Sequence, residues 1–273
     1  MLRFSNKRQA IKECPCGKSN KDGKFVPYII EGQVSNSCGF CHACGDTFLP
    51  SLDRKEINNQ GGKTKVIPLT ITQKLIDFTI VQKTLKAYSH NNFVIWLEKI
   101  VPNQVEYLLA CFNIGTAKDG GTLFWNINIH NQATTVKRVY YLENGHRDKN
   151  KLPEYIYKRS DGYLPCLFGE FQLTKRPYDY IILVESEKTA VVGTAIIPQF
   201  IWIATGGANG LTEEKAIVLK GRKVIIIYDC DNGGRKGAMR ASEILKSYYC
   251  QVHIEELDVA LQDGTDVVDM ILK

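Results

Sequence analysis

The sequence predicts an α/β protein in which a mainly parallel sheet occupies the C-terminal part. Three observations predict this fold: cysteines cluster near the N-terminus, helical and alternating patterns mix in the middle, and short apolar runs alternate with helices after residue 178. A chain of 273 residues with 44% hydrophobic content suits two or three folded units and excludes a disordered chain. We therefore expect a zinc-binding module at 1–50, a linker at 51–68, a mixed α+β region at 69–177 and an α/β domain at 178–273.

Charge is divided unevenly along the chain. The net charge is +6, but residues 1–177 carry +10 and residues 178–273 carry −4. The basic N-terminal part, residues 1–177, suits an anionic partner. The N-terminus has no apolar run typical of a signal peptide, and no segment approaches the roughly 18–20 apolar residues of a membrane helix. We expect a cytoplasmic protein without a membrane partner.

Five of the nine cysteines form two groups separated by 21 residues, and they are Cys14, Cys16, Cys38, Cys41 and Cys44. Clustered cysteines in a reducing compartment indicate metal ligands, and zinc takes four of them in a tetrahedron. A module of this size buries too little surface to fold without such a site. Four of the five are expected to bind structural zinc, and either Cys41 or Cys38 pairs with Cys44. The alternative is a set of buried free thiols.

The region after the polar linker mixes helices and antiparallel strands. Apolar residues keep helical spacing at 75–85 and again at 93–100, where Pro102 follows. The spacing then changes to alternation at 121–129. A second strand is expected at 136–142, ending at the turn Asn144-Gly145.

From Tyr180 onward, strands and helices alternate. Strands are expected at 180–184, 200–204, 223–228 and 251–257, with helices at 187–197, 212–220 and 234–249 between them. Runs such as Val224–Ile227 lack alternation, which is typical of strands covered on both faces. These features predict a mainly parallel sheet.

Acidic side chains follow two of these strands. Glu185 ends the first strand, and Asp229 and Asp231 follow the third. Because the carboxyl ends of parallel strands meet at one crevice, the three acids are expected to lie together. At about 4 Å and an effective dielectric near 20, each pair repels by roughly 4 kcal/mol, which a divalent cation reverses. Oxygen ligands of this kind suit Mg²⁺ shared with phosphate, with Mn²⁺ as an alternative.

Basic residues near the acids could bind phosphate. Lys188 lies at the start of the helix after Glu185, and Arg235 and Lys236 begin the helix after Asp231. The structural alternatives are that the acids only cap helices and that Arg235 and Lys236 face solvent.

The segment 134–159 interleaves basic residues with tyrosines. Basic side chains neutralise phosphates and aromatic rings stack on unpaired bases, so the segment suits single-stranded nucleic acid. Tyrosines are also ordinary strand residues. The expected nucleic-acid contacts here are Lys137, Arg138, Arg147, Lys158 and Arg159.

The two acidic motifs resemble a known family. The segments 184–190 (VESEKTA) and 228–241 (YDCDNGGRKGAMRA) are similar to the acidic motifs of Toprim domains, which occur in bacterial-type primases, topoisomerases and some nucleases. The second motif is most similar to the primase version. Segments 106–115, 123–127 and 166–169 follow the order of a primase core, and the cysteine-rich module, zinc-ribbon-like, precedes it. The whole resembles primase-like Toprim proteins of phages and mobile elements.

The resemblance implies that Glu185, Asp229 and Asp231 hold magnesium, with Lys188 beside them, while a 3′-hydroxyl attacks a nucleoside triphosphate on single-stranded DNA. The acid that primases place four residues after the first glutamate is here Thr189. No G-x-x-x-x-G-K-[ST] motif occurs, so the implied helicase partner is a separate protein. The alternatives are a metal-dependent nuclease using the same acids and a non-catalytic nucleic-acid-binding protein of a mobile element.

Overall fold

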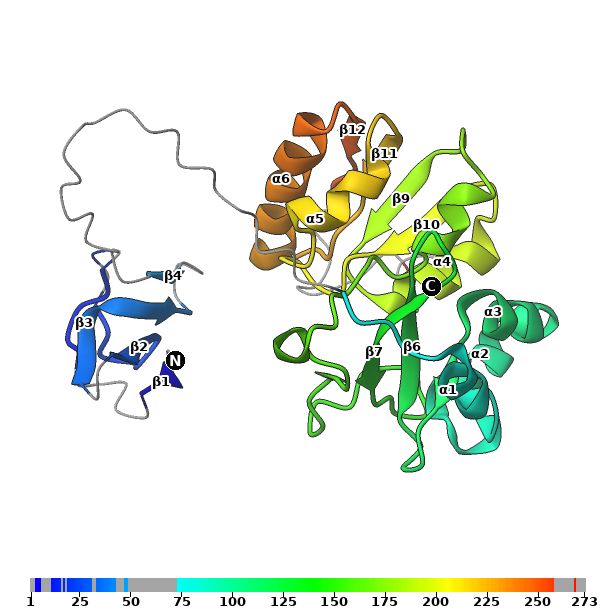
Figure 1. Ribbon diagram of the computed structural model, residues 1–273, viewed down its shortest axis with the longest axis horizontal. Helices are drawn as coiled ribbons and strands as arrows, with labels where there is room; N and C mark the ends of the chain where they lie inside the picture. The colour runs from blue at the N-terminus through cyan, green and yellow to red at the C-terminus, as the bar shows by residue number, and fades with distance from the viewer. Residues whose placement is uncertain are drawn as a thin grey trace. The chain divides into compact units, whose positions relative to one another are not determined.

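The computed structural model describes residues 3–5, 11–15, 17, 19–30, 33–42, 47–48, 73–257 and 268. The chain divides into two compact units, Met1–Pro68 and Leu69–Lys273 (Figure 1). The expected linker at 51–68 and the ligand candidates Cys16 and Cys44 lie outside the described residues. Across the described ranges, every helix is too short or too polar to cross a lipid bilayer.

The first unit is a small antiparallel sheet. Its strands lie in the order β1-β2-β3-β4 and span Arg3–Phe4, Phe25–Ile30, Gln33–Cys41 and Thr47–Phe48. Strands β2 and β3 pair antiparallel, and β3 carries two of the cysteines. Cys14, Phe25 and Cys41 form a buried cluster, against which Ile11 and Phe48 pack. Within the described residues of this unit, a cluster of this size supplies little hydrophobic stabilisation.

The second unit begins with three helices that cover an antiparallel sheet. The helices are α1 (Phe78–Thr84), α2 (Asn92–Ile100) and α3 (Val105–Phe112). The Asp77 and Asn91 side chains cap α1 and α2 by accepting hydrogen bonds from the backbone N–H groups of Thr79 and Phe93. The sequence predicts the first two helices but misses α3.

The antiparallel sheet has the order β5-β6-β7-β8, with strands at Gly115–Thr116, Thr122–Ile127, Ala133–Val139 and Glu154–Tyr155. Alternation in β6 predicts one exposed face, but all six residues of β6 are buried. Phe124 packs against Phe168 at 5.5 Å between ring centroids, whereas Trp125 packs against Tyr157 at 6.4 Å. Neighbouring residues of a strand point to opposite faces, so both faces of β6 are covered.

The parallel sheet has the order β10-β9-β11-β12, and every neighbouring pair is parallel. Its strands span Ile181–Val184 (β9), Ile201–Ala204 (β10), Lys223–Ile226 (β11) and Gln251–Ile254 (β12). The connecting helices are α4 (Glu187–Ile196), α5 (Glu213–Ala216) and α6 (Asn232–Ser247). Short 3-10 helices lie at Tyr88–His90, Pro102–Gln104, Arg159–Asp161, Glu170–Thr174 and Ile217–Leu219. The predicted α/β fold class is confirmed.

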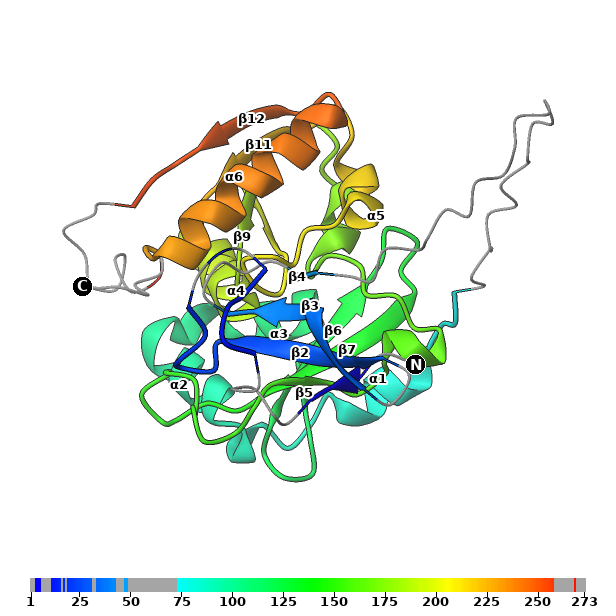
Figure 2. The ribbon, with the colours of Figure 1, turned by 90° about the vertical axis from the view of Figure 1, so that its left-hand side faces the viewer.

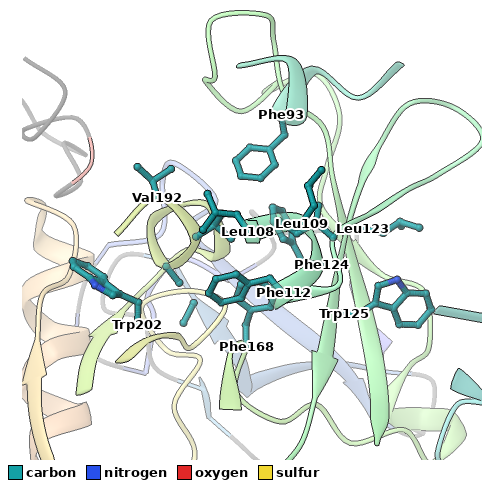
Figure 3. Packing of buried hydrophobic residues seen from close by; sticks show 14 of the residues in the cluster. Phe93, Leu108, Leu109, Phe112, Leu123, Phe124, Trp125, Phe168, Val192 and Trp202 are labelled. Atoms are coloured by element: carbon teal, nitrogen blue, oxygen red, sulfur yellow. The ribbon is translucent and has the colours of Figure 1, made fainter. Parts of the chain in front are cut away.

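Helices cover both faces of the parallel sheet. Figure 2 shows α6 lying along β11 and β12, and Ile181 and Leu183 pack in the core that includes residues of α5 and α6. Ile182 and Val184 face the other core, which combines α4, β10, α2, α3 and β6 (Figure 3). Because this second core contains side chains of both sheets, the antiparallel and parallel sheets are parts of one packed unit.

Candidate functional site

The acidic crevice, defined as Glu185, Asp229 and Asp231, lies at the carboxyl ends of β9 and β11. These strands are neighbours in the sheet, with Leu183 opposite Ile226. The chain leaves β9 toward β10 on one side, and β11 lies on the other, so the strand order reverses between β9 and β11. Ligands of open α/β sheets bind at such a reversal.

Glu185 and Asp229 are in direct contact. The backbone N–H of Asp229 donates to Oε1 of Glu185 at 3.1 Å. Glu185 is 9% exposed. Its burial raises the pKa of the Glu185 carboxyl to about 6, the Asp229 N–H opposes this rise and the nearby Asp231 charge adds to it. The structure therefore places the Glu185 carboxylate against the backbone of Asp229 and near the charge of Asp231, so the ends of the two strands meet.

Asp231 ends the loop and caps the following helix. Its Oδ1 accepts from the Gly234 N–H at 2.6 Å, and its own N–H donates to the Asp229 carbonyl at 2.8 Å. A Cβ atom at Gly234 would lie 2.1 Å from the Asp229 carbonyl oxygen and 2.9 Å from Oε1 of Glu185. Glycine is therefore required at this position for the loop to pass beside Glu185.

The acids do not form a closed metal-binding cluster in this arrangement. Within the part of the chain that the structure describes, no three His, Cys, Asp or Glu side chains converge to hold a metal ion. The chemistry of the acidic crevice nevertheless fits a divalent cation, since Glu185 is buried beside a second carboxylate and its pKa is raised. A bound cation would remove that electrostatic cost.

The cysteines of the first unit occupy two different environments. Cys14, Cys38 and Cys41 are all buried and none is in a disulfide. Cys14 and Cys41 share one buried cluster, whereas Cys38 lies outside it. Cys38 and Cys41 are three residues apart in β3, so their side chains point to opposite faces.

Lys188 is buried in the first turn of α4. Its Nζ lies 5.6 Å from the centroid of the Trp96 ring of α2, a cation–π contact between the two helices. Lys188 is 9% exposed, and its predicted contact with phosphate stays a prediction.

Lys137 and Glu187 form a buried ion pair that the sequence does not reveal. Lys137 Nζ donates to both carboxylate oxygens of Glu187, at 2.9 and 3.0 Å, and to the carbonyl of Gly206 at 3.1 Å. Lys137 belongs to β7, Glu187 to α4 and Gly206 to the loop after β10. The sequence indicates only that Glu187 needs a partner, because a helix as apolar as α4 is buried on most sides; it does not identify Lys137 as that partner.

The other basic residues expected to bind phosphate differ in whether they contact a partner within the protein. Arg138 forms ion pairs with Asp119 and Glu154, and Arg159 donates to Glu214 at 3.1 Å. Arg235 donates to the Asn232 side chain at 2.9 Å. The remaining expected contacts are exposed, and they are Arg147, Lys158 and Lys236.

The tyrosines of this region pack mostly against the protein. Tyr141 contacts Phe93 at 5.0 Å between centroids, and Tyr157 contacts Tyr163 at the same distance. Arg138 and Lys151 lie over the Tyr140 ring, at 5.6 and 4.4 Å from its centroid. These contacts favour the structural alternative for these three rings over stacking on bases.

A separate pocket of about 240 Å³ includes Glu170 and Lys215, neither of which the sequence singles out. Burial raises the pKa of Glu170 to about 7, although the N–H groups of Leu167 and Ile129 donate to its carboxylate. Burial lowers the pKa of Lys215, whose Nζ donates to the carbonyls of Thr205 and Gly210. Lys215 thus links this pocket to the loop after β10.

Solved structures of primases have a similar fold, whereas no curated protein matches the chain. The catalytic core of the E. coli primase is 15% identical with a TM-score of 0.52, and the match covers 71% of this chain and 73% of that chain. A DnaG primase catalytic domain bound to ssDNA is 17% identical with a TM-score of 0.50, again covering 71% and 73%. The zinc-binding and RNA polymerase domains of the Aquifex aeolicus primase match at 17% identity and a TM-score of 0.43. This match covers 64% of this chain and 56% of the primase chain. Over about 71% of its length, the chain therefore has a fold like that of primase catalytic cores.

A family profile matches residues 91–230. The matched segment runs from the cap of α2 through the antiparallel sheet to the loop after β11, and it includes Glu185, Glu187 and Asp229. It covers half of the chain and contains the strand ends that form the crevice. The chain belongs to the family described as Domain of unknown function (DUF6371).

Proposed function

We propose that the protein is a DNA primase or a primase-like nucleotidyltransferase with a Toprim-type site. The observation that carries the proposal is the contact between Glu185 and Asp229 at the strand-order reversal. The resemblance of both acidic motifs to those of primases and the primase-like fold support the same function.

Mg²⁺, or Mn²⁺ in its place, would be held by Glu185, Asp229 and Asp231. Such an ion supplies a Lewis acid for phosphate oxygens. The protein's own groups prepare the site: the Asp229 N–H orients the Glu185 carboxylate, and Gly234 lets the loop pass beside it. Arg235 and Lys236, exposed at the start of α6, would bind the triphosphate of the incoming nucleotide.

In the proposed reaction, the 3′-hydroxyl of a growing RNA primer attacks the α-phosphorus of a ribonucleoside triphosphate. A new phosphodiester bond forms, and pyrophosphate leaves. Single-stranded DNA is the template, which Arg147 and Lys158 would contact through its phosphates because their side chains are exposed on the antiparallel-sheet region. A separate helicase would supply that single strand.

Purified protein should be incubated with single-stranded DNA, labelled ribonucleotides and Mg²⁺. Short labelled RNA supports the primase, shortened DNA indicates the nuclease, and a gel shift alone indicates a binding protein. Asp229→Asn should abolish synthesis without loss of the fold. The matched control is Asp179→Asn, which removes a carboxylate before β9, at the opposite end of that strand from the crevice. Full synthesis by Asp229→Asn would overturn the site assignment.

We also propose that the first unit binds structural zinc through Cys14, Cys16, Cys41 and Cys44. The shared cluster of Cys14 and Cys41 supports this set over one that contains Cys38. Metal analysis of purified Cys14→Ser and Cys38→Ser tests it, because the two variants lose the same chemical group. Cys14→Ser should lose the zinc and Cys38→Ser should keep it, and the reverse result would exchange their assignments.

A further inference from the structure

The loop after β10, residues 205–207, is held by hydrogen bonds on two sides, beside the acidic crevice. The Gly206 N–H donates to the Glu185 backbone carbonyl at 3.0 Å, and the Thr205 N–H donates to the Val184 carbonyl at 3.0 Å. On its other side, the Gly206 carbonyl accepts from Lys137 Nζ at 3.1 Å. Gly206 therefore connects Glu185 directly to Lys137.

Lys137 is itself fixed by Glu187. Their side chains are 13% and 4% exposed, and Nζ contacts both carboxylate oxygens. A buried charge pair in this geometry leaves each partner few alternative positions, because moving either one leaves a charge buried without a counter-ion. Glu187 follows Glu185 by two residues at the start of α4, so it anchors the segment that carries Glu185.

The ion pair also joins the two sheets of the unit. Lys137 is in β7 of the antiparallel sheet, whereas Glu187 and Gly206 belong to connections of the parallel sheet; both sheets are seen in Figure 1. A Cβ atom at Gly206, whose φ is +91°, would lie 2.8 Å from the Tyr155 hydroxyl of β8. The loop is thus closely packed between β8 and Glu185.

We propose that Lys137 and Glu187 are positioning residues: their ion pair holds the 205–207 loop against the backbone of Glu185 and so places the Glu185 carboxylate for metal binding. The metal-binding part of this inference rests on the proposed function. In this role Lys137 contacts the interior of the site and does not bind a phosphate of nucleic acid. Glu187 in turn acts as the partner of Lys137 and not as a metal ligand.

The decisive variant replaces both residues, as Lys137→Met with Glu187→Met. Removing both charges avoids the uncompensated buried charge that either single variant leaves. The thermal midpoint of the double variant should therefore be higher than that of either single variant. The Gly206 carbonyl still loses its donor. Amide hydrogen exchange at Gly206, measured by NMR, should therefore become at least about tenfold faster, and the affinity for Mn²⁺, measured by calorimetry without substrate, should fall by about tenfold.

The matched control is Arg176→Met. Arg176 forms an ion pair with Asp179 and donates to the carbonyls of Phe200 and Gln199, so it anchors the opposite end of β10. It should lower the thermal midpoint and leave both Gly206 exchange and Mn²⁺ affinity unchanged.

Unchanged Gly206 exchange in the double variant would overturn the inference. Faster exchange with unchanged Mn²⁺ affinity would also overturn it, because the loop would then not position the carboxylate. If the wild-type protein binds no Mn²⁺, the proposed metal site fails, while the exchange result still decides whether the ion pair holds the loop.

Discussion

Two glutamates at the same edge of the parallel sheet have contrasting surroundings. Glu187 is 3% exposed and receives the ammonium group of Lys137. Glu185 is 9% exposed, and the structure, within its described ranges, gives its carboxylate a backbone N–H but no ion-pair partner, so its pKa is raised to about 6. The fold neutralises one buried carboxylate with its own lysine and leaves the other available to an external cation. Burial alone therefore does not distinguish these two glutamates; the internal counter-ion of Glu187 does.

The largest expected effect is a loss of folding stability when Lys137, the ion-pair partner of Glu187, is removed. Lys137→Met leaves the Glu187 carboxylate buried without a counter-ion, which should lower the free energy of unfolding by about 3–5 kcal/mol. Urea denaturation monitored by circular dichroism measures it. A loss below about 1 kcal/mol would show that water or another cation reaches Glu187, and the contrast with Glu185 would disappear.

The second effect compares the two glutamates in catalysis. Glu185→Gln removes a proposed metal ligand and should lower primer synthesis by at least about 100-fold, whereas Glu187→Gln keeps an oxygen acceptor for Lys137 and should lower it by about 10-fold. Single-turnover synthesis at a limiting Mg²⁺ concentration measures both, because a loss of metal affinity is hidden at saturation. Equal losses would mean that Glu187 also acts as a ligand.

How far the sequence predicts this edge of the sheet depends on the kind of contact. Glu185 and Asp229 are predictable because each follows a recognisable strand, and parallel strands bring their carboxyl ends together. The pair Lys137–Glu187 is not, because its partners are 50 residues apart and meet only through the packing of two sheets. The motif spacing likewise contains no information about Gly206, whose carbonyl completes the contacts of Lys137.

The prediction of secondary structure from the sequence is limited in the same way. The strands of the parallel sheet are predictable from short apolar runs, although the observed strands β11 and β12 end at Ile226 and Ile254, two and three residues earlier than expected. Helix α3 is missed because its sequence VEYLLACF is apolar on most sides and lacks a side-chain cap at Gln104. Only the core shared with α4 and β6 distinguishes this helix from a strand.

The pH dependence of stability gives a smaller effect. The pKa of Glu185, about 6 in the folded protein against an ordinary value of 4.5, means that the folded state binds the proton more tightly than the unfolded state. Ionised Glu185 therefore destabilises the fold above pH 6, and this cost is lost as the pH falls from 6 to 4.5. Glu185→Gln should be up to about 2 kcal/mol more stable than wild type at pH 8 and equal to it below pH 4.5.

Added Mg²⁺ should stabilise the wild type at pH 8 and have no effect on Glu185→Gln, because only a ligand that prefers the folded state shifts unfolding. Thermal midpoints across a Mg²⁺ titration provide the measurement. An equal shift in both proteins would place the ion elsewhere and would leave the Glu185 charge unexplained.

The smallest effect concerns an exposed ion pair, which extends the comparison to the surface. Arg159 and Glu214 contact each other at 3.1 Å with side chains 56% and 66% exposed, so Glu214→Gln should change the free energy of unfolding by less than about 1 kcal/mol. The same change releases Arg159 for phosphate and should raise the affinity for single-stranded DNA about twofold at low salt, with a steeper salt dependence. Fluorescence anisotropy with a labelled oligonucleotide at two salt concentrations measures this. Unchanged affinity would contradict the nucleic-acid contact that the sequence predicts for Arg159. A large loss of stability would show that surface pairs in this protein behave like the buried Lys137–Glu187 pair.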